Sequence, residues 1–193
     1  MTKPDGPART QLLDAAERIL VREGHAGVTT RRVGAEAGLN HGLIHYYFGS
    51  LDELFVQVFE RFTADLLERQ RALYSSGRPF IEVWRDAMAY LDKDVADGYQ
   101  KVWGELYSRA LNSPSLAPRV AAAYEAWRQV LRDGFRQPYD DLGMAELGLS
   151  LESVVTLVIT FNAGLGMEQL VGVRTGHAEL LADLDRWMEG RAR

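Results

Sequence analysis

The sequence predicts an all-α protein of about nine helices, with a small N-terminal helix-turn-helix domain and a larger C-terminal helical domain. Three observations support this prediction. No segment alternates apolar and polar residues over the length of a strand, whereas most windows place apolar residues three and four positions apart. Residues that start and stop helices separate these windows. The composition, 47% hydrophobic and 25% charged over 193 residues, is that of a folded globular chain.

The first two helices are expected over residues 8–23 and 30–37. The first stops at Gly24, because glycine adopts a positive φ at little cost. Thr29 is a good N-cap for the second helix, since its hydroxyl accepts a hydrogen bond from a free amide of the first turn. Gly38 ends the second helix in the same way as Gly24 ends the first.

The third helix, of about eight residues, is expected to begin after Asn40, a favourable N-cap. Leu39 and Ile44 are placed to form a hydrophobic staple across this start. The fourth helix begins at Ser50 and runs for roughly 25 residues. Ser50 and Glu53 fit a capping box, in which each side chain satisfies the other residue's backbone amide. This start is the best-defined helix boundary in the sequence.

The remainder of the chain predicts five more helices, at residues 80–96, 100–112, 117–136, 150–171 and 177–190. A segment with proline, two aspartates and two glycines, residues 137–148, is the longest expected loop. We place the boundary between the two domains along the fourth helix. The expected domains are therefore residues 1–55 and residues 56–193.

The composition excludes several classes of protein. The sequence has no cysteine, which removes disulfides, thiolate nucleophiles and cysteine-bound zinc. The first residues lack the apolar core of a signal peptide. The longest apolar stretch, residues 154–161, is far shorter than the roughly 18 residues of a membrane span. We therefore expect a cytoplasmic protein.

Charge is distributed unevenly along the chain. The net charge is −5, but residues 1–48 hold six Lys/Arg and five Asp/Glu, together with three of the four histidines. The remaining residues hold 16 basic and 22 acidic side chains. A neutral-to-basic segment joined to an acidic body is compatible with a small DNA-binding module.

The third helix has two different faces. A spacing of 100° per residue gives an apolar face, with Ile44, Tyr47 and Phe48, and an opposite face, with Gly42, His45 and Tyr46. The opposite face has no acid, and its glycine permits close approach. The preceding helix adds free amides at its N-terminus and the basic Arg31 and Arg32, which suit a phosphate. Two short helices of which the second presents polar groups are the layout of a DNA-binding helix-turn-helix.

Residues 28–55, VTTRRVGAEAGLNHGLIHYYFGSLDELF, resemble the N-terminal domain of the TetR family of transcriptional repressors. The positions that match the family pattern are Thr30, Arg31, Ala37, Gly38, Gly42, Tyr47, Phe48, Ser50 and Leu54. The resemblance implies a homodimer whose third helices enter the major groove at the two halves of a palindromic operator. It also implies a C-terminal domain for ligand binding and dimerisation, where a small apolar or amphipathic inducer releases the DNA.

The expected DNA-binding residues are Thr29, Thr30, Arg31, Asn40, His41, Gly42, Leu43, His45, Tyr46 and Tyr47. The sequence departs from the family at three positions. Asn40 stands where serine is usual and still caps, whereas His45 replaces a common tyrosine and Leu51 a common lysine. Both of those family residues typically touch the DNA backbone. Leu51 cannot make this contact, and a contact from His45 weakens as pH rises through the imidazole range.

The last two expected helices are the candidates for the dimer interface that the resemblance implies. The residues expected there are Leu151, Val155, Val158, Leu165, Leu181, Leu184 and Met188. They supply more apolar surface than one small domain is expected to bury, and Gly164 and Gly166 permit close helix approach. The alternative is that these helices pack only within one subunit.

The middle helices carry large apolar side chains that are spaced to point inward. The expected ligand pocket consists of Trp84, Met88, Trp103, Tyr107, Trp127, Phe161 and Asn162. Tryptophan and methionine fill irregular space and adapt to ligands, and Asn162 could orient a polar end of the ligand. The alternative is that these residues form an ordinary core, with Asn162 in a hydrogen bond inside the fold.

An enzyme is the first rival to a regulator. His41 and His45 have a spacing that can hold a metal, but no HExxH glutamate lies between them and no third ligand is apparent. The sequence also lacks a nucleophile elbow and a phosphate-binding loop. We therefore expect no enzymatic activity, no metal and no cofactor. A second alternative is a helical ligand-binding or scaffolding module without DNA binding, which the departures at His45 and Leu51 favour.

Overall fold

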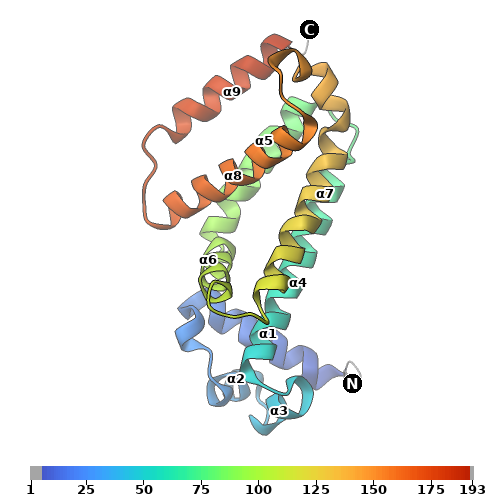
Figure 1. Cartoon of the computed structure of the whole chain (residues 1–193). Helices are drawn as coiled ribbons and strands as arrows, with labels where there is room; N and C mark the ends of the chain where they lie inside the picture. The colour runs from blue at the N-terminus through green and yellow to red at the C-terminus, as the bar shows by residue number, and fades with distance from the viewer. Residues whose placement is uncertain (1–5, 192–193) are drawn as a thin grey trace. The chain divides into compact units, whose positions relative to one another are not determined.

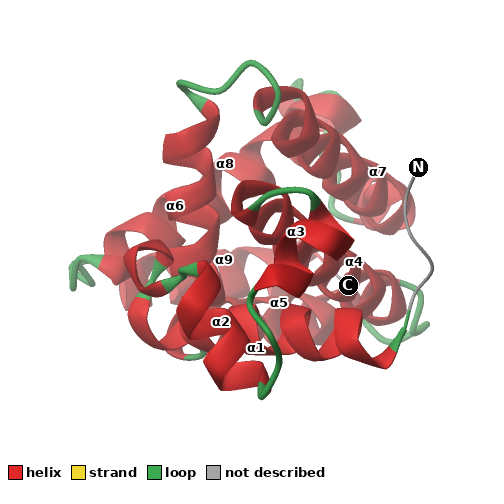
Figure 2. Ribbon diagram, turned by 90° about the horizontal axis from the view of Figure 1, so that it is seen from below, coloured by secondary structure: helices red, strands yellow, loops and turns green. Residues whose placement is uncertain are grey.

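The computed structural model describes residues 6–191, and within this range it contains only helices and their connections (Figures 1 and 2). The nine α-helices are α1 (Pro7–Glu23), α2 (Thr30–Ala37), α3 (Gly42–Phe48), α4 (Leu51–Tyr74), α5 (Phe80–Ala96), α6 (Tyr99–Ala110), α7 (Ala117–Asp141), α8 (Leu151–Leu170) and α9 (His177–Arg191). Two short 3₁₀ helices, η1 (His25–Gly27) and η2 (Ala145–Leu147), lie between them. The all-α prediction with about nine helices is confirmed.

The chain folds as two compact units, each made of two segments that are separate in the sequence. The first unit contains the residues up to Ala64 and Asp97–Val120, and the second contains Asp65–Ala96 and the residues from Ala121 onward. Helix α6 therefore belongs to the same unit as α1, α2 and α3. The expected domain boundary after residue 55 stays a prediction. So does the assignment of DNA binding to the first domain and of ligand binding and dimerisation to the second.

The core of the first unit forms where α1, α2, α3 and the start of α4 meet. Its fully buried side chains include Leu12, Ile19, Val33, Ile44 and Leu54. These residues come from four helices. On each helix they belong to the one face that apolar residues at a spacing of three or four form. Helix α6 packs on α1.

The core of the second unit includes two clusters of buried residues that involve α8 or α9. In one, Leu131 and Phe135 of α7 pack with Val154, Val155 and Ile159 of α8. In the other, the buried residues are Trp84 of α5, Leu142 and Met188 of α9. Helices α8 and α9 both pack against α5.

The expected loop over residues 137–148 is wrong in its first part. Helix α7 continues through Pro138 to Asp141. Proline removes one backbone hydrogen bond and disturbs the preceding turn, at a cost of about 3 kcal/mol. The apolar stripe of α7 nevertheless continues beyond it: Tyr139 packs against the α7–α8 core, and Leu142 is buried. The burial of these side chains explains why the helix passes through the proline.

No helix of the described residues combines the length and apolarity that crossing a membrane requires.

Candidate nucleic-acid interface

Helices α2 and α3 form the expected helix-turn-helix, and the two ends of α2 are capped as the sequence predicts. Thr29 Oγ1 accepts a hydrogen bond from Arg32 N at 3.3 Å. Gly38 ends α2 with a φ of 67°, in the left-handed region that favours glycine. Leu39 N then donates to Gly34 O at 2.9 Å, which closes the turn.

The two helices approach each other closely at Gly34. A Cβ atom built on this residue would lie 3.0 Å from the Cα, Cβ and N atoms of His41. Glycine at this position therefore sets how near the start of α3 can come to α2.

The start of α3 differs from the prediction by one residue. His41, not Asn40, occupies the N-cap position. Asn40 still satisfies a free amide, because its Oδ1 accepts from Gly42 N at 2.8 Å. The backbone of His41 is already helical, so the turn begins before the helix proper. The predicted staple positions of Leu39 and Ile44 are wrong by the same single residue.

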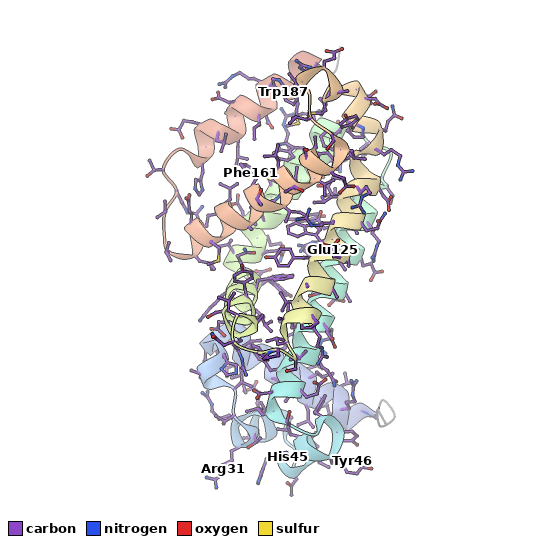
Figure 3. All side chains as sticks on the ribbon, in the orientation of Figure 1. Arg31, His45, Tyr46, Glu125, Phe161 and Trp187 are labelled. Atoms are coloured by element: carbon purple, nitrogen blue, oxygen red, sulfur yellow. The ribbon has the colours of Figure 1, made fainter. Side chains whose placement is uncertain are left out.

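The prediction of two faces on α3 is confirmed. Ile44 and Phe48 are buried and Tyr47 is half-buried, whereas Gly42, His45 and Tyr46 are exposed. Figure 3 shows Arg31 of α2 pointing away from the ribbon on the same side as His45 and Tyr46. Of the other expected DNA-binding residues, Thr29, Asn40 and His41 are exposed, and Thr30 and Leu43 are partly buried. Arg31, His45 and Tyr46 thus lie on the same side, whereas Tyr47 lies on the apolar face of α3.

A hydrogen bond to the end of α3 orients the His45 ring. Its Nδ1 lies 3.2 Å from the carbonyl oxygen of Gly49. A carbonyl only accepts, so a neutral His45 ring carries its proton on Nδ1 and leaves Nε2 as an acceptor. A phosphate oxygen also only accepts. Nε2 can therefore donate to a phosphate only when the ring is protonated.

The arginines of α1 and α2 differ in their partners. Arg32 Nη1 pairs with Glu23 at 2.5 Å, and Arg18 and Arg22 pair with Glu36. The guanidinium groups of Arg32 and Arg22 hold the pKa of the Glu23 carboxyl below its usual range. Arg31 is exposed and makes no ion pair within the described part of the chain. Its positive charge is therefore not balanced locally.

Helix α4 begins with half of the expected capping box. Ser50 Oγ accepts from Glu53 N at 3.0 Å, as predicted. The Glu53 carboxylate turns instead to Arg119, at 2.8 Å from Nη1, and to Gln57. Burial favours a raised pKa for Glu53, but these hydrogen bonds hold the pKa of the carboxyl below its usual value. The expected hydrogen bond from the Ser50 amide to the Glu53 carboxylate is therefore replaced by an ion pair with Arg119, 66 residues further along the chain.

Side chains of α6 form hydrogen bonds with the turn that precedes α2. The backbone N–H of His25 donates to Glu105 Oε2 at 2.6 Å, and Arg109 Nη1 bonds to His25 Nε2. Arg109 also bonds to Asp52 Oδ1 at 2.6 Å. Burial and the neighbouring Arg109 lower the pKa of His25. The neutral ring thus accepts a hydrogen bond from the guanidinium.

Comparison with known proteins identifies the family. The sequence model described as "Bacterial regulatory proteins, tetR family" matches residues 12–58. The HTH-type transcriptional repressor KstR2 of Rhodococcus jostii is 24% identical over 157 residues, which cover 80% of this chain and 72% of the relative. The chain belongs to the TetR family. It is a transcriptional regulator of that family.

Solved structures share the TetR fold over nearly the whole chain. The fatty acid degradation regulator FadR from Bacillus halodurans superimposes with a TM-score of 0.71 at 14% identity, covering 99% of both chains. A transcriptional regulator from Saccharomonospora viridis in complex with choline has a TM-score of 0.67 at 19% identity and covers 93% of each chain. At these identities the likeness concerns the fold.

The residues expected to line a ligand pocket of this TetR-family chain fall into both units. Trp84, Met88, Trp127, Phe161 and Asn162 belong to the second unit, whereas Trp103 and Tyr107 belong to the first. The prediction that Tyr107 points inward is wrong, because its side chain is 52% exposed. Val102 and Leu106 form the buried stripe of α6 instead. Trp103 packs edge-on against Phe59 at 4.8 Å between ring centroids.

Two of the expected pocket residues in the second unit lie side by side. The rings of Trp84 and Phe161 are stacked with centroids 6.1 Å apart. Asn162 is buried and donates through Nδ2 to Val158 O at 2.8 Å, which is the alternative weighed for it. Trp127 carries a buried Nε1 without a hydrogen-bond partner in the described range. The sequence carried no signal for this unsatisfied donor.

The residues expected at a dimer interface of the TetR type are corrected in part. Val155, Leu165 and Met188 are buried within the chain, so they cannot face a partner. Leu151, Val158, Leu181 and Leu184 are partly buried. The apolar side chains that α8 and α9 leave exposed are Leu157, Met167 and Leu180. Sequence reasoning missed these three, and for Leu157 and Met167 the reason is that α8 has apolar residues on every side.

Proposed function

We propose that this TetR-family chain is a homodimeric repressor that binds a palindromic operator and is released by a small apolar or amphipathic inducer. The observation that carries the proposal is the exposed face of α3, with Gly42, His45 and Tyr46, beside the N-terminus of α2. This face has no acid and stands opposite the buried Ile44 and Phe48. It has the size and polarity that fit a major groove.

In this proposal α2 contacts the phosphates of the DNA and α3 contacts the bases. Arg31 and the amides at the N-terminus of α2 suit a phosphate, because the helix dipole and the guanidinium both attract an anion. Gly42 lets α3 approach the bases, and Tyr46 and His45 present hydrogen-bonding groups beside it. Phosphate contacts fix the register, and contacts to base edges supply the sequence preference.

Selection of genomic DNA fragments by the purified protein, followed by affinity measurement against salt, tests the proposal. We expect a palindrome to be enriched and the affinity to fall steeply with salt, since each phosphate contact releases counterions. If no sequence is enriched even at low salt, the chain is the ligand-binding or scaffolding module without DNA binding.

Arg31 and Arg32 offer a matched pair for the phosphate contact. Both are exposed and adjacent on α2, but Arg32 is paired with Glu23. Arg31→Ala should weaken operator binding by at least about fivefold and lower the salt slope by about one for each phosphate that the variant no longer neutralises. Arg32→Ala should have a smaller effect on both. Equal losses of affinity in the two variants would remove Arg31 from its assigned role.

We infer that the exposed apolar side chains of α8 and α9 form the dimer interface. Leu157 is 55% exposed on α8, and Gly164 and Met167 lie at helical spacing on the same side. A Cβ on Gly164 would meet nothing within 4 Å, so the surface there is open to a partner helix. Leu157→Asp should shift the mass in solution from dimer to monomer. Leu111→Asp, at a 70% exposed leucine of the first unit, is the control that should remain dimeric.

An inducer site in the second unit is supported by the stacked Trp84 and Phe161 and by the unsatisfied Trp127 Nε1. A buried donor without a partner is costly, so an acceptor on a ligand would bind there favourably. The Saccharomonospora viridis regulator binds choline, a small amphipathic molecule. Release of the selected operator by choline, and loss of that release in Trp127→Phe, would support this site. Release that Trp127→Phe leaves unchanged would place the inducer elsewhere.

A further inference from the structure

A cleft of about 230 Å³ lies within the first unit, and none of its lining residues belongs to α2 or α3. Its walls come from the first turn of α4, the end of α6, the α6–α7 connection and the first turn of α7. The lining residues are Ser50, Asp52, Glu53, Phe55, Val56, Arg109, Ser113, Ser115, Leu116 and Arg119. All of them belong to one compact unit.

Two ion pairs line the cleft, so its wall carries both signs of charge. Arg109 Nη2 bonds to Asp52 Oδ1 at 2.6 Å, and Arg119 Nη1 bonds to Glu53 Oε2 at 2.8 Å. A lone anion has to compete with Asp52 for Arg109, and with both Glu53 and Glu60 for Arg119, because Glu60 Oε1 lies 2.7 Å from Arg119 Nη2. A lone cation has to compete with two guanidinium groups for the carboxylates. A molecule with one charge of each sign meets a partner for both.

The cleft has separate places for the two charged ends. Helices α4 and α7 both start at its wall, and their N-termini favour negative charge. Near the start of α7 lie the hydroxyls of Ser113 and Ser115, with their oxygen atoms 3.2 Å apart. This side suits a carboxylate. Asp52 Oδ1 binds Arg109, while Oδ2 has no hydrogen bond among the described residues, so it can accept from an ammonium group.

The floor and the volume of the cleft limit the size of the ligand. Phe55, Val56 and Leu116 are buried apolar residues that form one wall. The volume equals that of about eight water molecules, below the roughly 300 Å³ at which pockets for drug-sized ligands begin. A compact molecule with a small apolar group therefore fits.

We propose that this cleft binds a zwitterion of the size of an amino acid. Its carboxylate lies toward Ser113, Ser115 and Arg119, its ammonium lies toward Asp52, and its side group covers the apolar wall. The site is distinct from the inducer site in the second unit.

The test uses the full chain without DNA and the twenty common L-amino acids as probes. We expect at least one of them to raise the unfolding temperature, because a ligand that binds only the folded state stabilises it by mass action. Calorimetric titration then measures its affinity. The carboxylic acid without the ammonium and the amine without the carboxylate should each bind at least about tenfold more weakly, since each lacks one charged hydrogen bond.

Two variants and one matched control locate the ligand. Asp52→Asn should weaken binding of the amino acid by about tenfold without weakening that of the matched carboxylic acid, because the ammonium loses its charged acceptor while the carboxylate loses a competitor for Arg109. Ser115→Ala should weaken the carboxylic acid and the amino acid alike. Asp185→Asn removes the corresponding acid partner of Arg85 in the second unit and should change neither. The proposal is overturned if no amino acid binds, or if Asp52→Asn and Ser115→Ala bind it as the natural chain does.

Discussion

Helices α3 and α8 differ in how much their sequences say about which side faces inward. In α3 the polar residues lie on one side and the apolar residues on the other, and the structure buries the side that the spacing predicts. In α8 no charged residue stands between Glu152 and Glu168. There the structure buries Asn162 and exposes Leu157, the reverse of their polarity.

The cause of the difference is the number of apolar neighbours. Helix α3 packs on one side only, so its single apolar stripe identifies the contact. One side of α8 packs against Leu131 and Phe135 of α7, and we propose that another side meets a second subunit. A helix with two apolar partners is apolar all round, and its sequence cannot say which partner each side faces.

The largest expected effect separates the two sides of α8. Val155→Asp places a charge in the α7–α8 core, where Val155 is fully buried. We expect it to destabilise the fold by at least about 4 kcal/mol, because the carboxylate has no partner there. Leu157→Asp, two residues away, should change the stability of the isolated subunit by no more than about 0.5 kcal/mol, apart from the loss of dimerisation, which is recognised because it depends on protein concentration. Urea unfolding measures both. Equal losses of stability would mean that Leu157 is also a core residue.

The next largest expected effect is the difference in stability between variants on the two sides of α3. Ile44 is fully buried, and Ile44→Ala should cost about 2 to 4 kcal/mol, because it removes buried apolar surface and leaves a cavity. Tyr46 is 54% exposed, so Tyr46→Ala should leave stability within about 0.5 kcal/mol and weaken operator binding instead. Thermal unfolding and DNA titration of both variants test the contrast. A Tyr46→Ala protein that unfolds as easily as Ile44→Ala would contradict it.

Much of the first unit could be predicted because its signals are local. Thr29 and Ser50 accept from amides three residues away, and Gly38 donates to a carbonyl three residues away, so their residue types alone mark the ends of helices. The partner of Glu53 could not be predicted in this way. It is Arg119, 66 residues further along the chain, and a side chain that fits a local cap also fits a distant guanidinium.

The errors in the second unit have the same physical origin. Pro138 usually ends a helix, but the packing of Tyr139 and Leu142 carries α7 past it. The burial of Val155 and Met188 depends on which helices lie against α8 and α9. Each of these outcomes is decided by tertiary packing, which outweighs local propensity.

A smaller effect on stability concerns two glycines of the helix-turn-helix, Gly34 of α2 and Gly42 of α3. A Cβ on Gly34 would lie 3.0 Å from backbone atoms of His41, which cannot yield without moving the start of α3. Gly34→Ala should therefore cost about 1 to 3 kcal/mol. A Cβ on Gly42 would meet only Asn40 Oδ1, at 3.2 Å. Gly42→Ala should keep its stability and lose operator affinity, because the added methyl group stands on the exposed face. Unfolding and DNA titration distinguish the two outcomes.

The smallest expected effect is a pH dependence of stability that arises where α6 contacts the turn before α2. No pattern in the sequence predicted this contact. Burial and Arg109 lower the pKa of His25 in the fold, although Glu105 and Asp52 oppose this. A histidine whose folded pKa is lowered adds stability above its unfolded pKa of about 6.5. That stability is lost as pH falls below this value, because the unfolded ring takes up a proton more readily. Urea unfolding from about pH 7.5 to about pH 5.5 should therefore show a decline. In His25→Gln the decline should be shallower, since the other histidines remain in both proteins. Equal declines would mean that a protonated His25 is accommodated beside Arg109, and that the guanidinium does not depend on the neutral ring as its acceptor.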